Sequence, residues 1–265
     1  MTKLTFLKLG GSLITDKTRP YTPRLDKLAE LATQIAAATR LDPDLRLVLG
    51  HGSGSFGHAA ASQHWPVNAK WTRTDWRGFA EVWYQALALN RLVVDALHGA
   101  GIPTISFPPS ATCQANEGAI VDWYLPPLQE ALETGIIPLI QGDVAFDAAI
   151  HGTILSTEDL FFKLAQRLHP QRILVAGLEK GVWADFPERT RLIEVITPES
   201  FEAVAASLAG AAGMDVTGGM RDKVEQMVRL VEQVPGLEVH VFSGEETGNV
   251  QRALLGEAVG SFIRR

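Results

Sequence analysis

The chain has 265 residues, of which 46% are hydrophobic and 20% charged, and its formal net charge is −6. This length and apolar content suffice for one large α/β domain or two closely joined lobes. The acidic balance and the lack of a basic stripe argue against nucleic acid as a partner. No apolar run is long enough to cross a bilayer or to form a signal peptide, so we expect no membrane partner and a cytoplasmic location.

The first half of the chain alternates apolar strands with helical patterns. In chain order it predicts a strand at 4–9, a helix at 23–40, a strand at 45–49, helices at 56–64 and 74–98, strands at 104–107 and 118–122, and a helix at 125–133. The single cysteine, Cys113, excludes an intrachain disulfide and a cysteine-based zinc site. Its apolar neighbours favour a core residue over a nucleophile.

The second half continues the alternation. It predicts a strand at 136–141, a hairpin over 144–154, a helix opening at Ser156 with a capping box to Asp159, a strand at 172–176, a loop over 177–187, a helix at 198–208, an irregular stretch over 210–219, a helix at 220–234, a strand at 237–242, a helix at 249–255 and a strand at 258–263. The whole pattern predicts a mostly parallel sheet covered on both faces, with ligands beyond the carboxyl ends of its strands.

Glycine is concentrated directly after the strand at 45–49. Four glycines fall within residues 50–57, and His58 follows them. Such a loop lets backbone N–H groups approach an anion, and a helix starting near Phe56 would point its positive end at the same place. The stretch therefore predicts a phosphate site with His58 in reach of it. The alternative for His58 is a first-turn histidine satisfied by a backbone carbonyl.

The same loop matches the dinucleotide-binding fingerprint through Gly52, Gly54 and Gly57. Asp75 lies near the position expected for a ribose-binding acid. The fingerprint belongs on the first strand-to-helix turn, however, whereas here another strand and turn precede it. Asp75 also falls inside a helical pattern. We therefore disfavour a nicotinamide or flavin cofactor.

Two lysines flank the glycine pair that follows the first strand. The order is Lys8, Gly10, Gly11, Ser12 and then Lys17. Lysine can follow a phosphoryl group as its charge shifts, and the glycine amides can meet phosphate oxygens. The alternative is a strand-end lysine beside an ordinary tight turn. No P-loop motif occurs in the chain.

A second glycine pair, at 218–219, opens the helix predicted at 220–234. Thr217 suits the N-cap position, and Lys223 lies within about the first turn. A cation there is unfavourable for the helix dipole, which indicates a separate reason for its presence. A purely structural role is the alternative.

Two further features carry open alternatives. Asp143 follows Gly142 at the end of the most apolar strand, where it could position Mg²⁺, orient lysines or cap a turn. Trp76, Phe79 and Trp83 form one helical stripe. The stripe is either core or the wall of an apolar pocket for a hydrocarbon tail beside a phosphate.

Together these motifs resemble the amino acid kinase superfamily and, within it, the isopentenyl phosphate kinase family. The order is kept along nearly the whole chain. The motifs that carry the resemblance are Lys8-Leu-Gly-Gly-Ser12, Ile14-Thr-Asp-Lys17, His51-Gly-Ser-Gly-Ser-Phe-Gly-His58, Gly142-Asp143, Ile154-Leu-Ser-Thr-Glu-Asp159, Gly181-Val-Trp183, Asp185-Phe-Pro187 and Asp215-Val-Thr-Gly-Gly-Met-x-x-Lys223. The Ser-Phe-Gly-His ending separates this family from most relatives, and a fosfomycin kinase branch shares its Phe-Gly-His part.

The resemblance implies one domain, a three-layer αβα sandwich with a mainly parallel open sheet, usually as a homodimer. It implies an acceptor-binding lobe at about 1–168, a nucleotide-binding lobe at about 169–265, and transfer of a phosphoryl group from ATP, with Mg²⁺, to a small monophosphate with an apolar tail. The implied catalytic residues are Lys8, Lys17, Lys223 and His58. The implied nucleotide contacts are Lys8, Gly10, Gly11, Ser12, Gly54, Gly181, Asp185, Gly218, Gly219 and Lys223. The implied acceptor contacts are Ser53, Gly54, His58, Gly142, Asp143, Trp76, Phe79 and Trp83.

One segment departs from the family pattern. The nucleotide loop usually reads Thr-Asp-Val-Asp-Gly-Val-Tyr, whereas here it reads Gly177-Leu-Glu-Lys-Gly-Val-Trp183. The usual acids are absent, which leaves the nucleotide preference open. The alternatives to an isopentenyl phosphate kinase are a kinase of a small phosphonate such as fosfomycin, and a non-catalytic nucleotide sensor.

Overall fold

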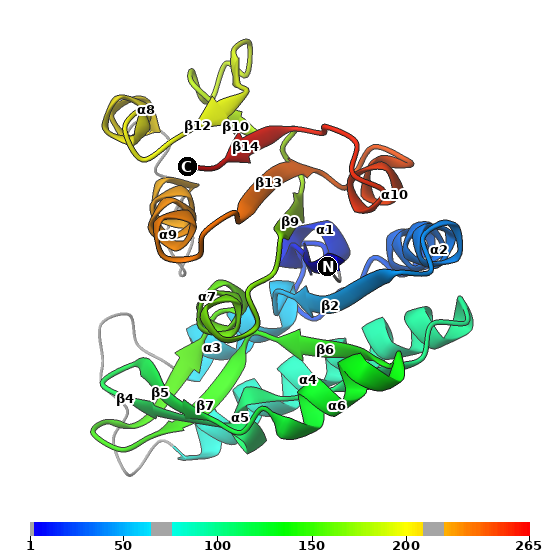
Figure 1. The fold of residues 1–265 in the computed structure, drawn as a ribbon. Coiled ribbons are helices and arrows are strands. Elements are labelled where there is room, and N and C mark those ends of the chain that lie inside the picture. Colours follow the sequence, from blue (N-terminus) through cyan, green and yellow to red (C-terminus); the bar gives the residue numbers. More distant parts are fainter. Residues whose placement is uncertain (1–2, 65–75, 209–219) are drawn as a thin grey trace.

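The computed structural model describes residues 3–64, 76–208 and 220–265, and an eight-stranded sheet runs through it (Figure 1). The strand order is β12-β14-β13-β9-β1-β2-β6-β3. The strands are β1 (Lys3–Leu9), β2 (Leu45–His51), β3 (Thr104–Ser106), β6 (Ile137–Gln141), β9 (Arg172–Gly177), β12 (Val195–Ile196), β13 (Glu238–Ser243) and β14 (Ser261–Ile263). Only the β13–β14 pairing is antiparallel among these described strands, so the predicted mainly parallel sheet is confirmed.

Helices cover both faces of this sheet, because successive residues of each central strand point into opposite cores. In β1, Phe6 packs into one core and Leu7 into the other. The first face is covered by α6 (Pro126–Thr134), α7 (Thr157–Leu168), α8 (Phe201–Leu208) and α9 (Met220–Gln233), and the second by α1 (Gly11–Ile14), α2 (Leu25–Leu41), α4 (Trp76–Gly99) and α10 (Asn249–Leu254). The three-layer αβα sandwich is therefore confirmed.

A second, four-stranded sheet extends from the first, in the order β5-β4-β7-β8. It comprises β4 (Cys113–Asn116), β5 (Ala119–Trp123), β7 (Asp143–Asp147) and β8 (His151–Leu155), and α5 (Pro109–Thr112) precedes it. The strand expected at 118–122 and the hairpin over 144–154 are confirmed, whereas β4 is too short to show a period of two in the sequence. Cys113 lies in the core as expected, and burial raises the pKa of its thiol to about 12.

The loop predicted over 177–187 is only partly a loop. Val182–Trp183 forms β10, which pairs with β11 (Leu192–Ile193). Two-residue strands depend on a partner distant in the chain, so local periodicity does not reveal them. The helix predicted at 198–208 begins later, at Phe201, because the Thr197 N–H donates to Ser200 Oγ (2.9 Å) in a preceding turn. The irregular stretch over 210–219 lies outside the described residues.

The carboxyl ends of the central strands are level with one another. Lys8 of β1 pairs with Gly50 of β2 and with Val175 of β9. In the same way, His51 pairs with Gln141 at the end of β6. Every loop that leaves these strands therefore begins at one edge of the sheet, where ligands of open α/β sheets bind. In the described part of the chain, no helix combines the length and the apolar character that crossing a bilayer requires.

Candidate active site

A cavity of about 440 Å³ lies at this carboxyl edge. It brings together ten of the predicted site residues: Lys8, Gly10, Gly11, Ser12, Lys17, Ser53, Gly54, His58, Gly142 and Lys223. They come from the ends of β1, β2 and β6, from the starts of α1, α3 (Gly54–His64) and α9, and, for Lys17, from the turn that follows α1. Three lysines and a histidine thus face one space lined with glycine backbone, as an anion site requires.

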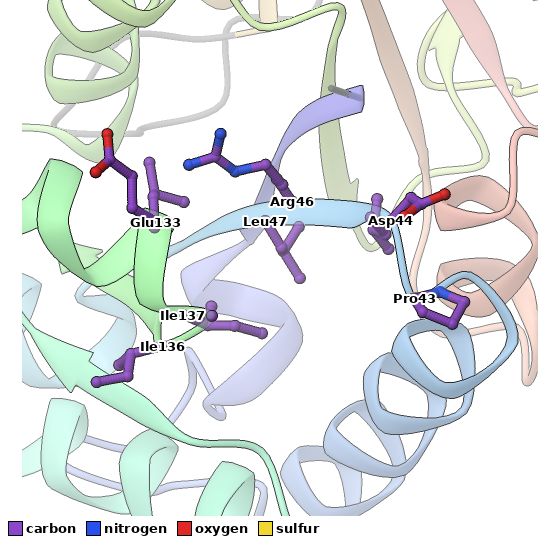
Figure 2. Close-up of a pocket in the computed structure, with 10 residues that line it drawn as sticks. Pro43, Asp44, Arg46, Leu47, Glu133, Ile136 and Ile137 are labelled. Carbon is purple, nitrogen blue, oxygen red and sulfur yellow. The ribbon is translucent and has the colours of Figure 1, made fainter. Parts of the chain in front are cut away.

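A larger cavity of about 540 Å³ lies at the opposite edge, where β2 and β6 begin (Figure 2). Leu47, Ile136 and Ile137 line it, and Arg46 and Glu133 lie on the same side of it in Figure 2. It contains none of the glycine loops and a single cationic side chain among its described lining residues. The amino-terminal edge is also not where parallel sheets place their ligands. The smaller cavity is therefore the candidate active site.

The two glycine loops at the active-site cavity touch backbone to backbone. A Cβ on Gly11 would lie 2.5 Å from the Gly54 nitrogen, and one on Gly52 would lie 2.9 Å from the Gly11 nitrogen. Gly54 also has a φ of +51°, which disfavours any residue with a side chain. Thr15 joins the two loops by hydrogen bonds: its Oγ1 donates to the Gly11 carbonyl (2.7 Å) and accepts from the Ser55 N–H (2.9 Å). We name this arrangement the glycine cradle (residues 10–12 and 52–54).

Helix starts add to the positive potential of the cradle. Within the described residues, four helices (α1, α3, α7 and α9) contribute first-turn residues to the cavity. The start of α7 is fixed by the predicted capping box, in which Ser156 Oγ accepts from the Asp159 N–H (3.1 Å) and Asp159 Oδ2 accepts from the Ser156 N–H (3.0 Å). Because N-terminal helix ends carry partial positive charge, this convergence favours an anionic ligand.

Glu158 is a site residue that the sequence reasoning did not single out. It lies in the first turn of α7, and its carboxylate forms a buried ion pair with the Lys8 ammonium. Burial alone would raise the pKa of the Glu158 carboxyl, but the charges of Lys8 and Lys223, together with the hydrogen bond from Lys8, outweigh this effect and hold that pKa below its usual value. The signal available in the sequence was an acid directly before the capping-box Asp159. Glu158 therefore anchors one of the three lysines.

A buried polar network supports the cradle from below. His51 Nδ1 lies 3.1 Å from the Gly52 carbonyl oxygen, and Asn90 Nδ2 lies 3.1 Å from both His51 Nε2 and Gln141 Oε1. Burial lowers the pKa of His51 to about 4, so the ring is neutral at physiological pH. Thr157 Oγ1 donates to the His51 carbonyl (2.7 Å), which joins α7 to β2. His51 is thus a structural residue beneath the cradle.

Asp143 does not reach the cavity, although the preceding Gly142 does. Its side chain is buried, and Asp143 Oδ1 accepts from the Val144 N–H (2.7 Å). Burial raises the pKa of Asp143 to about 7, against the opposing effect of hydrogen bonds from Val144 and Ser110. Asp143 therefore lies beneath the site, because the strand β7 turns its first side chain inward, and its contact with the acceptor stays a prediction.

The aromatic stripe also lies away from the cavity. Phe79 is buried and packs with Trp76 (5.3 Å between centroids) and with Phe146 of β7 (5.0 Å), while Trp76 and Trp83 are 40% and 37% exposed. None of the three predicted residues is among the described lining residues, because the start of α4 packs against β7 rather than over the cradle. A link exists through Ile154, which lines the cavity and packs against the cluster of Ala60, Ala61, Phe79, Val82 and Val144.

The C-terminal half supplies a mainly apolar part of the cavity. Its lining residues are Val175, Ala176, Gly177, Leu178, Glu179, Phe186, Met220, Lys223, Val224, Met227, Val241 and Ile263.

Of the predicted nucleotide contacts, Asp185 lies outside this lining and organises a turn by accepting from the Thr190 N–H (3.2 Å) and the Arg191 N–H (3.1 Å). Gly181 packs closely against Ser261 and is also outside the cavity. Gly218 and Gly219 lie outside the described residues.

Comparison with known proteins identifies the family of the chain. Residues 3–243 match the model of the amino acid kinase family. The isopentenyl phosphate kinase of Methanothermobacter thermautotrophicus is 34% identical over 97% of both chains, and that of Methanocaldococcus jannaschii is 32% identical over 98% of both. An X-ray structure of an isopentenyl phosphate kinase superposes with a TM-score of 0.82 at 30% identity, covering 98% of this chain and 99% of that one. The chain therefore belongs to the amino acid kinase family.

Proposed function

We propose that the chain transfers the γ-phosphoryl group of ATP to isopentenyl phosphate, which yields isopentenyl diphosphate and ADP for isoprenoid biosynthesis. The observation that carries this proposal is the convergence of Lys8, Lys17, Lys223 and His58 on one glycine cradle. The similarity to isopentenyl phosphate kinases over nearly the full length supports the choice of acceptor.

The chemical difficulty of this reaction is the approach of two anions. An oxygen of the acceptor phosphate attacks the γ-phosphorus in line, and the bond between that phosphorus and the β,γ-bridging oxygen breaks as ADP leaves. The acceptor oxygen is already ionised, so a strong general base is unnecessary. The ammonium groups of Lys8, Lys17 and Lys223 offset the repulsion and stabilise the charge that spreads over the transferring group. The ion pair with Glu158 holds Lys8 in place for this role.

The two substrates enter from different halves of the cavity. His58 and Ser53 lie on the side of α3, where a monophosphate would meet the helix start and the imidazole. The hydrocarbon tail of the acceptor then points toward Ile154, behind which lies the apolar cluster that contains Phe79. ATP occupies the C-terminal side, where Leu178, Phe186 and other apolar residues offer a surface to the base.

The donor set does not fit a magnesium ion held by the protein itself. Across the described residues, no group of three or more His, Cys, Asp or Glu side chains could hold a metal. Glu158 is committed to Lys8, and Asp143 is buried outside the cavity. We therefore treat Mg²⁺ as part of the Mg·ATP substrate and assign it no protein ligand.

The decisive experiment measures ADP release with isopentenyl phosphate and, separately, with fosfomycin. We expect turnover with isopentenyl phosphate to exceed that with fosfomycin. His58→Ala should lower kcat/KM for the acceptor ~10²–10³-fold, the cost of one well-placed donor, and leave acceptor-independent ATP hydrolysis nearly unchanged. His98→Ala is the matched control, since His98 Nε2 contacts the Thr104 carbonyl (2.9 Å) at the far end of α4.

Two outcomes would contradict the proposal. Equal or better turnover of fosfomycin would point to the phosphonate kinase, and ATP binding without turnover of either acceptor would point to the nucleotide sensor. An unchanged acceptor kcat/KM in His58→Ala would remove the role of His58. The homodimer, the cytoplasmic location and the division into an acceptor lobe and a nucleotide lobe stay predictions.

A further inference from the structure

One arginine, Arg189, holds in place the segment 177–183, whose sequence differs from the usual nucleotide loop of the family. Arg189 donates to Glu179 through Nε (3.0 Å to Oε2) and Nη2 (2.9 Å to Oε1), in the two-point geometry that suits a guanidinium and a carboxylate. The Arg189 Cζ also lies 4.6 Å from the centroid of the Phe186 ring. Glu179 and Phe186 both line the active-site cavity, whereas Arg189 is not among its described lining residues.

The rest of the segment supports this contact. Trp183 Nε1 donates to Glu179 Oε2 (2.9 Å), so both carboxylate oxygens of Glu179 are engaged. The Ala184 N–H donates to the Arg191 carbonyl (2.9 Å), and Asp185 caps the turn that leads to Arg189. The side chain of Glu179 is 29% exposed and that of Arg189 is 45% exposed, so the pair lies at the rim of the cavity and not in its depth.

This arrangement has an electrostatic consequence for a polyphosphate ligand. Glu179 is an acid in the wall of a cavity that also presents Lys8, Lys17 and Lys223. The other acid among the described lining residues, Glu158, is already paired with Lys8. The hydrogen bond from Arg189 lowers the pKa of Glu179, so its carboxylate is charged at neutral pH. Without a cation beside it, the Glu179 carboxylate would repel the phosphates of a nucleoside triphosphate. The guanidinium of Arg189 neutralises this carboxylate and holds it against the cavity wall.

We propose that Arg189 is a positioning residue for the nucleotide: it neutralises Glu179 and supports the Phe186 ring, so that this wall of the cavity accepts ATP. The inference rests on the proposed function only in naming ATP as the ligand. Arg189 takes no part in the phosphoryl transfer itself. It acts before chemistry, so its loss changes nucleotide affinity and leaves the transfer step and acceptor binding in place.

The test compares Mg·ADP binding by calorimetry and steady-state kinetics in four variants. Arg189→Ala should raise the Kd of ADP and the KM of ATP about tenfold, because it removes a charge-assisted fork and leaves the carboxylate unpaired. We expect kcat and the acceptor KM to stay within about twofold. Arg189→Lys keeps the charge without the planar fork and should fall between the parent and Arg189→Ala.

The double variant Glu179→Gln/Arg189→Ala isolates the electrostatic part. With no carboxylate left to repel phosphate, it should recover most of the lost ADP affinity, and the remainder measures the support given to Phe186. Arg252→Ala is the matched control. Arg252 lies on α10, is 51% exposed and pairs with Glu257 (2.7 Å), and neither residue is among the described lining residues of the cavity. It should leave all constants unchanged.

Three results would overturn the inference. They are an ADP affinity in Arg189→Ala within twofold of the parent, a double variant no better than the single one, and a fall in kcat with no rise in the Kd of ADP, which would place the effect of Arg189 on the transfer step. Because ADP binding needs no acceptor, a failure to phosphorylate isopentenyl phosphate would contradict the proposed function and leave this inference testable. If Arg189→Ala does not fold, Arg189→Lys and the double variant still decide the question.

Discussion

The two ends of the active-site cavity are built by different physical means. At the acceptor end, the glycine cradle is fixed by exclusion, since a Cβ on Gly11 would lie 2.5 Å from the Gly54 nitrogen. At the nucleotide end, the wall formed by Glu179 and Phe186 is fixed by attraction to a side chain, Arg189, that comes later in the chain. Where two backbone segments touch, no residue larger than glycine fits. A pair of attracting side chains, in contrast, can be replaced by another attracting pair. Substitutions at the acceptor end should therefore reduce activity strongly, whereas the nucleotide end should tolerate substitutions that keep an attracting pair.

The largest expected effect comes from breaking the cradle. Gly11→Ala places a methyl group against backbone atoms of the facing loop, and backbone cannot move away as a flexible side chain can. We expect kcat/KM to fall ~10²–10³-fold for the acceptor and for ATP, as when a preorganised donor to the transition state is lost, because the cradle joins predicted contacts of both substrates. The measurement is steady-state ADP release with each substrate varied in turn, together with the melting temperature.

Gly99→Ala is the control for that variant. A Cβ at Gly99, the last residue of α4, would meet nothing within 4 Å. Activity should therefore match the parent, and the loss of a flexible glycine should not lower stability. A Gly11→Ala enzyme with parental kcat/KM would show that the two loops can move apart, and the contrast between the two ends of the cavity would fail.

The same contrast explains which parts of the site could be predicted from sequence. The cradle was predictable because exclusion requires glycine, and glycine pairs at strand ends are visible in the chain. Lys8 and Lys17 could be selected because they flank the first glycine pair, and Lys223 because a cation in the first turn is unfavourable for the helix dipole. Glu158 and Phe186 could not, because their importance depends on which residues lie across the cavity. At the nucleotide end the family pattern pointed to Asp185, one residue away from the cavity-lining Phe186.

The fold follows a similar division. Strands buried on both faces, such as β1 and β2, are near-continuous apolar runs that end in glycine, and their bounds were predicted within about two residues. The short strands β4, β10, β11 and β12 were missed, since two to four residues carry no measurable period. The aromatic stripe was ambiguous, and its position was decided by the packing of α4 against β7. Tertiary contacts thus settled what local patterns left open.

A second, smaller effect concerns the anchor of Lys8. Glu158→Gln keeps the shape of the side chain but removes the charge that holds the ammonium group in place. A misplaced ammonium group should lower kcat by up to ~10²-fold. The KM for ATP should stay the same or fall, because a negative charge has left the phosphate site. Pre-steady-state phosphoryl transfer separates this loss from slow product release.

Gln166→Glu is a counterpart on the same helix that leaves the site intact, because Gln166 contacts Gln233 at the surface (2.6 Å). We expect parental kinetics from this variant. If Glu158→Gln instead raised the KM for ATP while kcat stayed constant, Glu158 would be organising the binding of the nucleotide and not the geometry of transfer. Rigid placement of Lys8 would then matter less for catalysis than the rigidity of the glycine cradle indicates.

The smallest effect distinguishes two aspartates outside the cavity, Asp143 and Asp185, each next in the chain to a cavity-lining residue, Gly142 and Phe186. Burial raises the pKa of Asp143 from 3.8 to about 7 in the folded chain. The folded state therefore holds a proton that the unfolded state has lost between these pH values, so the contribution of Asp143 to stability declines as pH rises from about 4 to about 7. Asp185 has the opposite sign: a hydrogen bond from Thr190 lowers its pKa, and its contribution is present above 3.8 and lost below.

Asp143→Asn should accordingly raise the melting temperature at pH 8 by at least roughly 2–4 °C, the equivalent of about 1 kcal/mol in a chain of this size, and the gain should vanish near pH 4. Asp185→Asn should lower the melting temperature slightly at pH 8 and bring no gain at any pH. Thermal unfolding followed by circular dichroism from pH 4 to pH 8 gives both curves. A constant offset for Asp143→Asn would mean that the buried carboxyl is ionised throughout this range, and two parallel curves would mean that the surroundings of the two aspartates do not differ in how they treat charge.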